Sequence, residues 1–383
     1  MDLLIETVRR FVDREVRPTA RALEHADQYP HALVERMAEL GLFGMGVPSE
    51  HDGLGLDYET YARIFEELSR GWMSLAGVLG THGIVCYVVR EFGSDAQKRR
   101  WLPALASGRL RGGLALTEPQ GGSDVANLQT RARKAGDGWI LDGHKQFITN
   151  THEGNVFLAV ARTGGAGAGG LSAFVVEKER CAAGTLVEGK PLGKLGYKGL
   201  KTSSLTFDGC RVDGEALVGG EAGHGFAQVM SGLEVGRINV AARAVGVARA
   251  ALEELRKILT DAGVEISYDK PSHAQSAAAA EFLRMEADWE AGYLLTVRSA
   301  WQADNNIPNS KEASMGKAKS ARVATDITLK AVELAGTTGY SEETLLEKWA
   351  RDSKILDIFE GTQQIQQLVV ARRLLGLSSA ELK

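Results

Sequence analysis

The stretch Leu114-Ala-Leu-Thr-Glu-Pro-Gln-Gly-Gly-Ser-Asp124 lies close to the point at which the sequence changes from helical to β patterning. On its amino-terminal side, apolar residues between Leu4 and Val16 recur at the spacing of one helical face. On its carboxyl-terminal side, short runs of β-branched and aromatic residues are separated by Gly, Asn and Asp. From Phe226 onward the helical period returns. This order argues against a doubly wound nucleotide-binding fold, in which strand and helix alternate throughout.

These patterns predict individual elements and divide the 383 residues into three parts. Pro18 is expected to end the first helix, because proline lacks the N–H that a helix interior needs, and Ser94 or Asp95 is placed to cap a helix. The other expected helices cover 33–40, 61–68, 96–105, 240–259, 277–301, 321–334 and 365–375, and the expected strands cover 139–141, 147–149, 156–159, 171–176 and 204–207. The sequence therefore predicts an α+β multidomain protein with an N-terminal helical domain (1–112), a central β domain (113–225) and a C-terminal helical bundle domain (226–383).

Composition and charge exclude several classes of protein. The formal net charge of −4 gives no excess of basic residues for binding nucleic acid. We expect the sequence to contain no stretch of eighteen apolar residues that could span a membrane. The first residues lack the pattern of a secretory signal, and the eight histidines show no metal-ligand spacing, so no metal is expected. The three cysteines, Cys86, Cys181 and Cys210, are too few and too widely spaced for a disulfide framework or a zinc site, which favours a cytoplasmic location.

A formal GxGxxG match occurs at Gly165, Gly167 and Gly170. The dinucleotide fingerprint needs a strand before it and a helix after it. Here the glycines lead into the apolar run 171–176, which reads as a second strand. The pattern therefore predicts a flexible hairpin loop.

Two polar segments are candidates for ligand binding. The first places Thr117, Gly122 and Ser123 after an apolar run, where glycine lets a ligand approach the backbone and the hydroxyls can form hydrogen bonds. In the second, Phe147 has the shape to lie against a planar ring while Thr149 bonds to the edge of that ring. Either segment alone is also consistent with an ordinary polar turn.

The third candidate segment surrounds Glu360, which directly precedes Gly361. Thr362 is placed to cap the helix that follows. A carboxylate at such a break, flanked by apolar side chains, would be partly desolvated and therefore a stronger base. On chemistry alone, a surface glutamate at a helix end remains the simpler interpretation. The apolar residues before Glu360 are expected to share one buried helical face: Ile355, Ile358 and Phe359.

Taken in this order, the three segments resemble those of the acyl-CoA dehydrogenase family. The resemblance extends over essentially the whole chain and includes Pro48-Ser-Glu-His-Asp-Gly-Leu-Gly-Leu-Asp57 and Lys194-Leu-Gly-Tyr-Lys-Gly-Leu-Lys-Thr-Ser203. It implies a helical N-terminal domain, a central β-barrel-like domain and a C-terminal four-helix bundle. It also implies FAD as cofactor and an oligomer, either a homotetramer or a hetero-oligomer with a related subunit.

The resemblance further implies roles for single residues. Glu360 matches the catalytic base, and Gly236 stands where some relatives place the base on an earlier helix, although Glu234 lies close by. Phe147 occupies a position where many relatives have tryptophan. The positions that match FAD contacts are Leu116, Thr117, Gly122, Ser123, Phe147, Thr149, Thr362 and Gln364. The positions that match contacts to the thioester substrate are Ser123, Arg237, Gly361 and Arg372.

The implied reaction is the FAD-dependent dehydrogenation of an acyl thioester, acyl-CoA or acyl-carrier-protein, to a trans-2-enoyl thioester. Glu360 would remove the α-proton, its N–H and a ribityl hydroxyl would stabilise the developing charge on the carbonyl oxygen, and the β-hydride would pass to the flavin. An electron-transfer flavoprotein is the implied electron acceptor. Two alternatives stay open: a noncatalytic or cofactor-sharing subunit of a hetero-oligomer, and a flavin oxidase or monooxygenase on the same scaffold.

The sequence departs from the family pattern near the expected FAD pyrophosphate. Relatives carry an arginine in a segment that corresponds here to 261–275, which contains none. Glu333 replaces a common glutamine, and Thr337 replaces a common glycine. A missing cation and an added carboxylate would weaken pyrophosphate binding. We therefore expect a partner subunit to supply the cation, or Lys257 or Lys270 to compensate.

Overall fold

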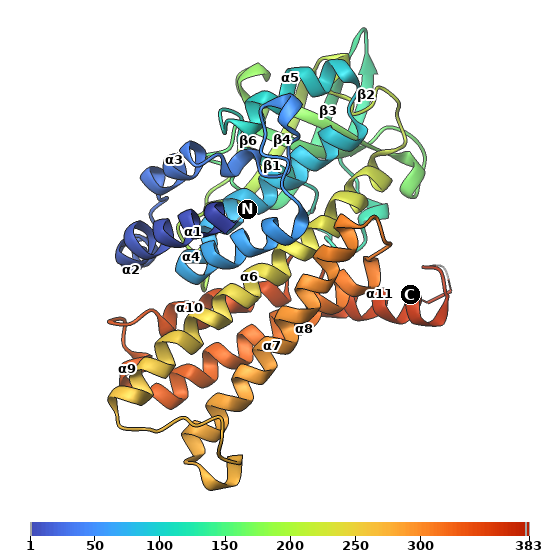
Figure 1. The fold of residues 1–383 in the computed structure, drawn as a ribbon. Coiled ribbons are helices and arrows are strands. Elements are labelled where there is room, and N and C mark those ends of the chain that lie inside the picture. The colour runs from blue at the N-terminus through green and yellow to red at the C-terminus, as the bar shows by residue number, and fades with distance from the viewer. Residues whose placement is uncertain (1, 380, 383) are drawn as a thin grey trace.

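The computed structural model of the protein describes residues 2–379 and 381–382. Helices from both ends of the chain pack together, and a bent β-sheet lies at one end of this helical body (Figure 1). The α+β class and the order of helices, strands and helices are as predicted. The bounds 1–112, 113–225 and 226–383 of the three domains stay predictions.

The amino-terminal part is helical. Its helices are α1 (Asp2–Phe11), η1 (Val12–Val16), α2 (Arg17–His25), α3 (His31–Glu39), η2 (Leu42–Gly44), η3 (Ser49–His51), α4 (Tyr58–Phe92) and α5 (Asp95–Ala106). Ser94 caps α5 as expected, because its side chain accepts a hydrogen bond from Gln97 N–H while the Gln97 side chain accepts one from Ser94 N–H.

The prediction that Pro18 ends the first helix is wrong. The chain passes from α1 through the wider turn of η1 directly into α2, and Pro18 lies in the first turn of α2. A proline is tolerated there because the wide turn and the new helix start do not need its N–H.

The central part is a seven-stranded sheet with the path β1-β4-β2-β3-β7-β6, and β5 pairs with β4. Its strands are β1 (Gly112–Ala115), β2 (Arg131–Ala135), β3 (Gly138–Thr149), β4 (Val156–Arg162), β5 (Leu171–Glu177), β6 (Leu186–Glu188) and β7 (Thr202–Val212), and the short helices around them are η4 (Val125–Asn127), η5 (Ala168–Gly170), η6 (Lys178–Arg180) and η7 (Gly214–Ala216). The runs 139–141 and 147–149, expected as two strands, form one strand, β3, with register shifts against β7. The glycines of the GxGxxG match connect the antiparallel strands β4 and β5, which confirms the hairpin.

The carboxyl-terminal part is helical again, as predicted. Three long helices, α6 (Gly225–Asp261), α7 (Ala277–Asp304) and α8 (Ser310–Ala335), run side by side in Figure 1. They are followed by α9 (Thr337–Tyr340), α10 (Leu346–Ser353), η9 (Lys354–Asp357) and α11 (Gln363–Leu375), and η8 (Ser272–Ala274) precedes α7.

Helices α4 and α6 form the centre of the molecule and pack against each other. The backbone of α4 kinks at the buried Trp72, whose φ of −153° is not helical. By length and composition α4 is apolar enough to cross a membrane, so the expectation that no such stretch exists was wrong. However, 83% of its most apolar window is buried inside the protein, as in the core helix of a globular domain.

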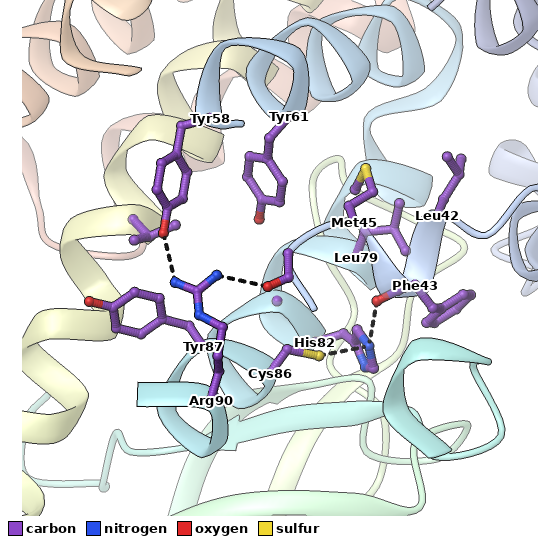
Figure 2. A pocket seen from close by; sticks show the side chains of 13 residues that line it. Leu42, Phe43, Met45, Tyr58, Tyr61, Leu79, His82, Cys86, Tyr87 and Arg90 are labelled. Carbon is purple, nitrogen blue, oxygen red and sulfur yellow. Dashed lines mark hydrogen bonds between the residues drawn. The ribbon is translucent and has the colours of Figure 1, made fainter. Parts of the chain in front are cut away.

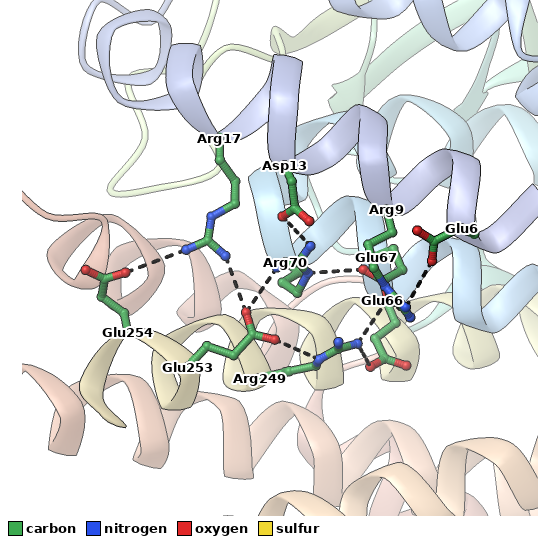
Figure 3. A network of polar contacts seen from close by, with 10 residues as sticks. All are labelled: Glu6, Arg9, Asp13, Arg17, Glu66, Glu67, Arg70, Arg249, Glu253 and Glu254. Atoms are coloured by element: carbon green, nitrogen blue, oxygen red, sulfur yellow. Dashed lines mark hydrogen bonds and ion pairs between the residues drawn. The ribbon is translucent and has the colours of Figure 1, made fainter. Parts of the chain in front are cut away.

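An ion-pair network ties α1 and η1 to α4 and α6 (Figure 3). The Arg70 guanidinium donates to Glu67 at 3.0 Å, to Asp13 at 2.5 Å and to Glu253 at 3.1 Å. Arg249 on α6 donates to Glu67 at 3.1 Å and completes the link. The acidic and basic groups of the network thus satisfy one another where these four elements meet.

Two of the cysteines lie together. The thiols of Cys181 and Cys210 approach to 3.1 Å, although 29 residues separate them in the sequence. All three cysteines are free thiols. The sequence spacing gave no sign of this proximity, because Cys210 belongs to β7 and Cys181 follows η6.

Candidate active site

Glu360 occupies a strained turn between η9 and α11. Its φ is +52°, and that of the following Gly361 is +90°. A left-handed backbone costs a non-glycine residue about 1–2 kcal/mol, and such positions concentrate at functional sites. Thr362 caps α11 as predicted, because its Oγ1 accepts a hydrogen bond from Ile365 N–H at 3.3 Å.

Side chains from two helices hold the carbonyl groups of this turn. Lys317 on α8 donates from Nζ to the Gly361 carbonyl oxygen at 2.5 Å. Gln366 on α11 donates from Nε2 to the carbonyls of both Glu360, at 3.2 Å, and Gly361, at 3.1 Å. The Glu360 N–H itself has no hydrogen-bond partner within residues 2–379 and 381–382. The turn therefore leaves one backbone donor available beside a fixed carboxylate.

The Glu360 carboxylate rests against Gly236 of α6. A β-carbon at Gly236 would lie 2.7 Å from Glu360 Oε2, so a larger residue there would displace the carboxylate from this position. Oε2 is buried without a hydrogen-bond partner among the described residues, and the whole side chain is 17% exposed. The prediction of a partly desolvated carboxylate is therefore confirmed by its burial.

Arg243 is the group that sequence reasoning missed at this site. Its Nη2 donates to Glu360 Oε1 at 2.6 Å, and its side chain is only 1% exposed. The apolar Phe359 expected beside Glu360 is present, and the buried guanidinium of Arg243 is an addition that the sequence analysis did not predict. A signal existed in the sequence, because Arg243 is a single charge within a run of small residues of α6 that are otherwise buried.

The neighbours of Arg243 come from several elements. Nη2 also donates to Asn239 Oδ1 at 2.8 Å, and Nη1 lies 3.4 Å from the Tyr197 hydroxyl. The guanidinium carbon stands 4.8 Å from the centre of the Phe359 ring. Across the helix interface, a β-carbon at Gly80 of α4 would lie 3.5 Å from Arg243 Nη2. The guanidinium is thus enclosed between α4, α6 and the turn that carries Glu360.

The expected common face of Ile355, Ile358 and Phe359 does not form. The segment is a short 3₁₀ turn followed by bends rather than an α-helix. Ile358 is 53% exposed, whereas Ile355 and Phe359 pack against the core.

Lys317 completes the charged groups of the site. Burial lowers the pKa of its ammonium to about 8, against the opposing effects of Glu360 and Asp357. The buried Lys317 ammonium thus holds the turn through a hydrogen bond and lies among the charged groups of the site.

The first two polar segments lie side by side. Gln146 N–H donates to the Thr117 carbonyl at 2.8 Å. Lys145 Nζ donates to the Leu116 carbonyl at 3.1 Å and to Glu118 Oε1 at 2.8 Å. Lys145 and Glu118 are both buried, with side-chain exposures of 0% and 2%. Residues that are widely separated in the sequence are therefore held together by a buried ion pair.

Burial and the charges of this pair act in opposite directions on the pKa of each partner. Burial raises the pKa of the Glu118 carboxyl, but the Lys145 ammonium and hydrogen bonds from Thr130 and Gln129 outweigh it and lower the pKa to about 2. Burial lowers the pKa of Lys145 to about 8, although Glu118 opposes this shift.

The residues expected to contact a cofactor surround this pair. Phe147 lies at a register shift of β3 with a φ of +58°, and its ring is 56% exposed. Thr117 and Thr149 are half-buried, Leu116 is buried, and Gly122 and Ser123 are exposed. A β-carbon at Gly122 would lie 3.0 Å from Thr117 Oγ1.

Helix α4 connects these segments with the Glu360 turn. The Thr81 hydroxyl accepts a hydrogen bond from Leu114 N–H at 3.1 Å, two residues before Leu116. The preceding residue, Gly80, faces Arg243 across the interface with α6. The two halves of the predicted site thus meet along one stretch of α4.

A pocket lies beside this stretch, between α4, the loop around Phe43 and α6 (Figure 2). Tyr61 and Arg90 line it, together with Val235, which directly precedes Gly236. Burial, the neighbouring Tyr58 and the Glu360 carboxylate all raise the pKa of the Tyr61 hydroxyl. The pocket is therefore close to the carboxylate that the sequence singled out.

The remaining predicted residues lie at the edges of the site. Arg237 is mostly buried next to Gly236, with its Nη1 3.5 Å from Ser310 Oγ, and burial lowers its pKa. Arg372 donates from Nε to the Leu382 carbonyl at 2.7 Å, toward the end of the chain. Gln364 is exposed in the first turn of α11. Within the described part of the chain, no three His, Cys, Asp or Glu side chains are grouped to hold a metal.

Positively charged side chains lie in and near the segment 261–275, which lacks the arginine expected from the family resemblance. Lys270 donates to Glu265 at 2.8 Å, and Lys257 is exposed on α6. Glu333, whose carboxylate was expected to disturb pyrophosphate binding, accepts a hydrogen bond from Lys330 at 2.6 Å. The loop before α7 thus carries one lysine, Lys270, and that lysine already has an acidic partner.

Comparison with known proteins places these features in a family. Models of the acyl-CoA dehydrogenase N-terminal, middle and C-terminal domains match residues 2–109, 113–210 and 223–375. The mitochondrial short-chain specific acyl-CoA dehydrogenase of Rattus norvegicus is 36% identical over 382 residues, which cover 97% of this chain and 89% of the relative. The (2S)-methylsuccinyl-CoA dehydrogenase of Cereibacter sphaeroides is 37% identical over 394 residues, covering 98% of this chain and 69% of the relative.

A solved structure agrees with the match. The chain superimposes with a TM-score of 0.91 and 32% identity on a structure described as an electron transferring flavoprotein of Acidaminococcus fermentans, studied for flavin-based electron bifurcation. The superposition covers 98% of this chain and 97% of that chain.

Proposed function

We propose roles for the residues of this site from the premise that the chain belongs to the acyl-CoA dehydrogenase family. The protein is therefore an FAD-dependent oxidoreductase that dehydrogenates an acyl thioester between its α and β carbons to a trans-2-enoyl thioester. The relatives named above act on acyl groups that differ at the end of the chain, so family membership leaves the acyl group open.

The residues of the first two segments fit a flavin. Phe147 offers an exposed aromatic face at a backbone position that is strained for a side chain. Gly122 keeps the Thr117 hydroxyl accessible, since a larger residue would press against it. In our proposal these three residues hold FAD together with Leu116, Ser123 and Thr149, while Thr362 and Gln364 contact it from the start of α11. When bound, FAD accepts the hydride from the β-carbon of the substrate.

Glu360 is our proposed catalytic base. The observation that supports it best is a carboxylate fixed on a left-handed turn, with Oε2 buried, unpaired and pressed against Gly236. A fixed and partly desolvated carboxylate is suited to remove the α-proton, which is too weakly acidic to leave unaided. The Glu360 N–H, free of other partners in the described chain, is aimed at the thioester carbonyl oxygen in this proposal and stabilises its developing negative charge.

The substrate contacts belong to the same proposal. Arg237 follows Gly236 directly, and its charge is close enough to Lys317 to contribute to lowering the pKa of that ammonium. We assign Arg237, Gly361, Ser123 and Arg372 to the thioester and its carrier. The proposal covers both coenzyme A and an acyl carrier protein as carriers, because both present the same thioester.

The electron acceptor and the oligomeric state are proposed from fewer observations. An electron-transfer flavoprotein is the proposed electron acceptor, supported by the family resemblance and by the structural similarity to a protein described with that name. A homotetramer, or a hetero-oligomer in which a related subunit supplies the missing cation, is proposed because Lys270 is engaged with Glu265. The free thiols fit a cytoplasmic location, which also stays a proposal.

An anaerobic titration tests the role of Glu360. The purified flavoprotein is mixed with butyryl-CoA, glutaryl-CoA and longer thioesters while the visible flavin band is recorded. We expect bleaching with at least one thioester, and a loss of at least 1,000-fold in its rate in Glu360→Gln, because a neutral amide cannot accept the α-proton. The matched control is Glu342→Gln, at an exposed position of the loop before α10.

The same titration separates the alternatives. A chain without bound flavin would favour a noncatalytic or cofactor-sharing subunit. Rapid oxygen consumption, with no reduction by any thioester under anaerobic conditions, would favour an oxidase or monooxygenase. An undiminished rate in Glu360→Gln would remove Glu360 from the mechanism and turn attention to Glu234.

A further inference from the structure

Arg243 has no role in the family reaction as described above, yet its charge lies inside the site. We propose that Arg243 binds a carboxylate at the far end of the acyl group, so that the substrate is the monothioester of a short dicarboxylic acid. This inference rests on the proposed function of Glu360 as the base.

The burial of Arg243 is the first argument. A guanidinium stays charged in proteins, and a buried charge needs an anionic partner. Glu360 supplies the one carboxylate within 4 Å of Arg243 among the described residues. Arg243 therefore has a counterion only as long as Glu360 is ionised.

The second argument is a conflict between these two residues. A base that takes up the α-proton becomes neutral, and Arg243 would then be left as a buried charge without a counterion. Lys317 on α8 donates to the Gly361 carbonyl of the same turn and adds a second positive charge beside Glu360. Proton abstraction in this arrangement is opposed by the surrounding cations unless another anion enters with the substrate. A carboxylate on the acyl group would supply that anion and release Glu360.

Unused donors are the third argument. Arg243 Nε is buried without a hydrogen-bond partner in the described chain, and so is Nδ2 of Asn239, one helical turn earlier on α6. A carboxylate has acceptor sites for both, and the planar fork of an arginine can bind it through two N–H groups. An uncharged alkyl chain would leave both donors unsatisfied.

The short distance between the two residues limits the length of the acyl group. A carboxylate base stands roughly 3–3.5 Å from the carbon whose proton it removes, and Arg243 Nη2 lies 2.6 Å from Glu360 Oε1. The guanidinium is then roughly 6 Å from the α-carbon, and its hydrogen bond spans about half of that distance. Two or three carbon–carbon bonds fill the remainder, which corresponds to a succinyl-like or glutaryl-like backbone.

A substrate comparison in the holoenzyme tests the proposal. Glutaryl-CoA is compared with pentanoyl-CoA, which has the same number of carbons and no carboxylate, and succinyl-CoA is compared with butyryl-CoA. We expect kcat/KM to be at least 100-fold higher for one dicarboxylyl thioester than for its uncharged counterpart. Equal or higher kcat/KM for both uncharged thioesters would overturn the proposal, and this result needs no variant.

Arg243→Met separates recognition of the substrate from positioning of the base. If Arg243 binds the carboxylate, kcat/KM falls at least 100-fold for the preferred dicarboxylyl thioester, whereas kcat/KM for its uncharged counterpart stays equal or rises, because the cation that opposes proton uptake by Glu360 is gone. Arg243→Lys should recover part of the loss. An equal fall for both thioesters would show that Arg243 only positions Glu360 and would overturn the proposal.

Binding without turnover gives an independent measurement. Glu360→Gln keeps Arg243 and should bind the preferred dicarboxylyl-CoA at least tenfold more tightly than the uncharged one, as measured by calorimetry. Equal affinity for the two would contradict the proposal. If no thioester of any kind reduces the flavin of the wild-type protein, the proposed function fails instead, which is a different result from a preference for uncharged chains.

Discussion

Gly236 of α6 lies against the carboxylate of Glu360, and a β-carbon at position 236 would lie 2.7 Å from Glu360 Oε2. Gly236→Ala should therefore displace the carboxylate from the position that it occupies now. We expect kcat to fall at least tenfold while thermal stability stays equal or rises, because alanine is favoured over glycine in a helix by about 1 kcal/mol. Steady-state kinetics and thermal unfolding of the same preparations check both parts.

Gly316→Ala provides the matched control for this substitution. Gly316 also lies inside a long helix, α8, but a β-carbon there would meet its nearest neighbour at 3.4 Å, an ordinary contact. The control should retain wild-type kcat. Wild-type kcat in Gly236→Ala would show that the carboxylate does not need this space.

Local patterns predicted features that depend on residues close in sequence. The caps at Ser94 and Thr362 arise from contacts three residues apart, and the strand after the glycines at 165–170 pairs with the strand just before them. Hydrophobic periodicity likewise predicted the order of helices and strands. Such features can be read from one segment at a time.

Tertiary contacts explain what the sequence did not reveal. Arg243 and Glu360 are 117 residues apart, and no local pattern connects them. The chain stays helical up to Pro18 and beyond it because the wide turn η1 leads directly into α2. Such a turn lacks a simple sequence signature. The exposure of Ile358 depended on a 3₁₀ turn that breaks the expected period of a helix.

The buried ion pair between Lys145 and Glu118 is expected to be essential for stability. Lys145→Met leaves the Glu118 carboxylate buried without its cation, which typically costs about 3–5 kcal/mol. The double variant Lys145→Met with Glu118→Gln should recover part of this loss, because the unpaired charge is then absent. Urea unfolding measures the stability, and the flavin-to-protein absorbance ratio shows whether the adjacent Leu116–Thr117 backbone still holds FAD.

The exposed Lys190 offers a control for the loss of a lysine elsewhere in the β-sheet region. Lys190→Met should leave both the unfolding midpoint and the flavin content unchanged. If Lys145→Met behaved in the same way, the ion pair would not be a structural support of the cofactor segment.

His82 should make the folded state sensitive to mild acid. Its imidazole is buried, and burial lowers its pKa to about 4 from an ordinary value of 6.5. Its Nδ1 accepts a hydrogen bond from Gly112 N–H at 3.0 Å, which requires an unprotonated nitrogen. Between pH 6.5 and 4 the unfolded chain binds a proton that the folded protein does not bind, so this group lowers stability as the pH falls through that range.

The expected loss from this single histidine is about 2 kcal/mol between pH 7 and pH 5. His82→Gln should reduce the pH dependence of the unfolding free energy by that amount, whereas His273→Gln, at an exposed position, should not. Urea unfolding at the two pH values gives the comparison. Identical pH dependence in wild type and His82→Gln would contradict the assignment.

Arg70 is expected to be the central residue of the network in Figure 3. Its side chain is 7% exposed and pairs with Glu67, which is 3% exposed. Arg70→Met should destabilise the protein by about 3 kcal/mol, because Glu67 then loses a close cation in a buried position. Catalysis per folded molecule should not change, since the network is separate from the Glu360 turn. Arg36→Met, which removes an exposed pair with Glu39, should have no measurable effect.

Phe147 combines a strained backbone with an exposed ring, and two substitutions can separate these properties. Phe147→Gly removes both the ring and the strain, so the protein without cofactor should gain up to about 1 kcal/mol of stability. Phe147→Ala removes the ring but keeps a β-carbon at a φ of +58°, so no such gain is expected. Both variants should release flavin more readily than the wild-type protein, because both lack the aromatic face. A glycine variant that gains stability and loses flavin would show that the strain at Phe147 is maintained for cofactor binding. Full flavin retention in both variants would show that the ring has no part in it.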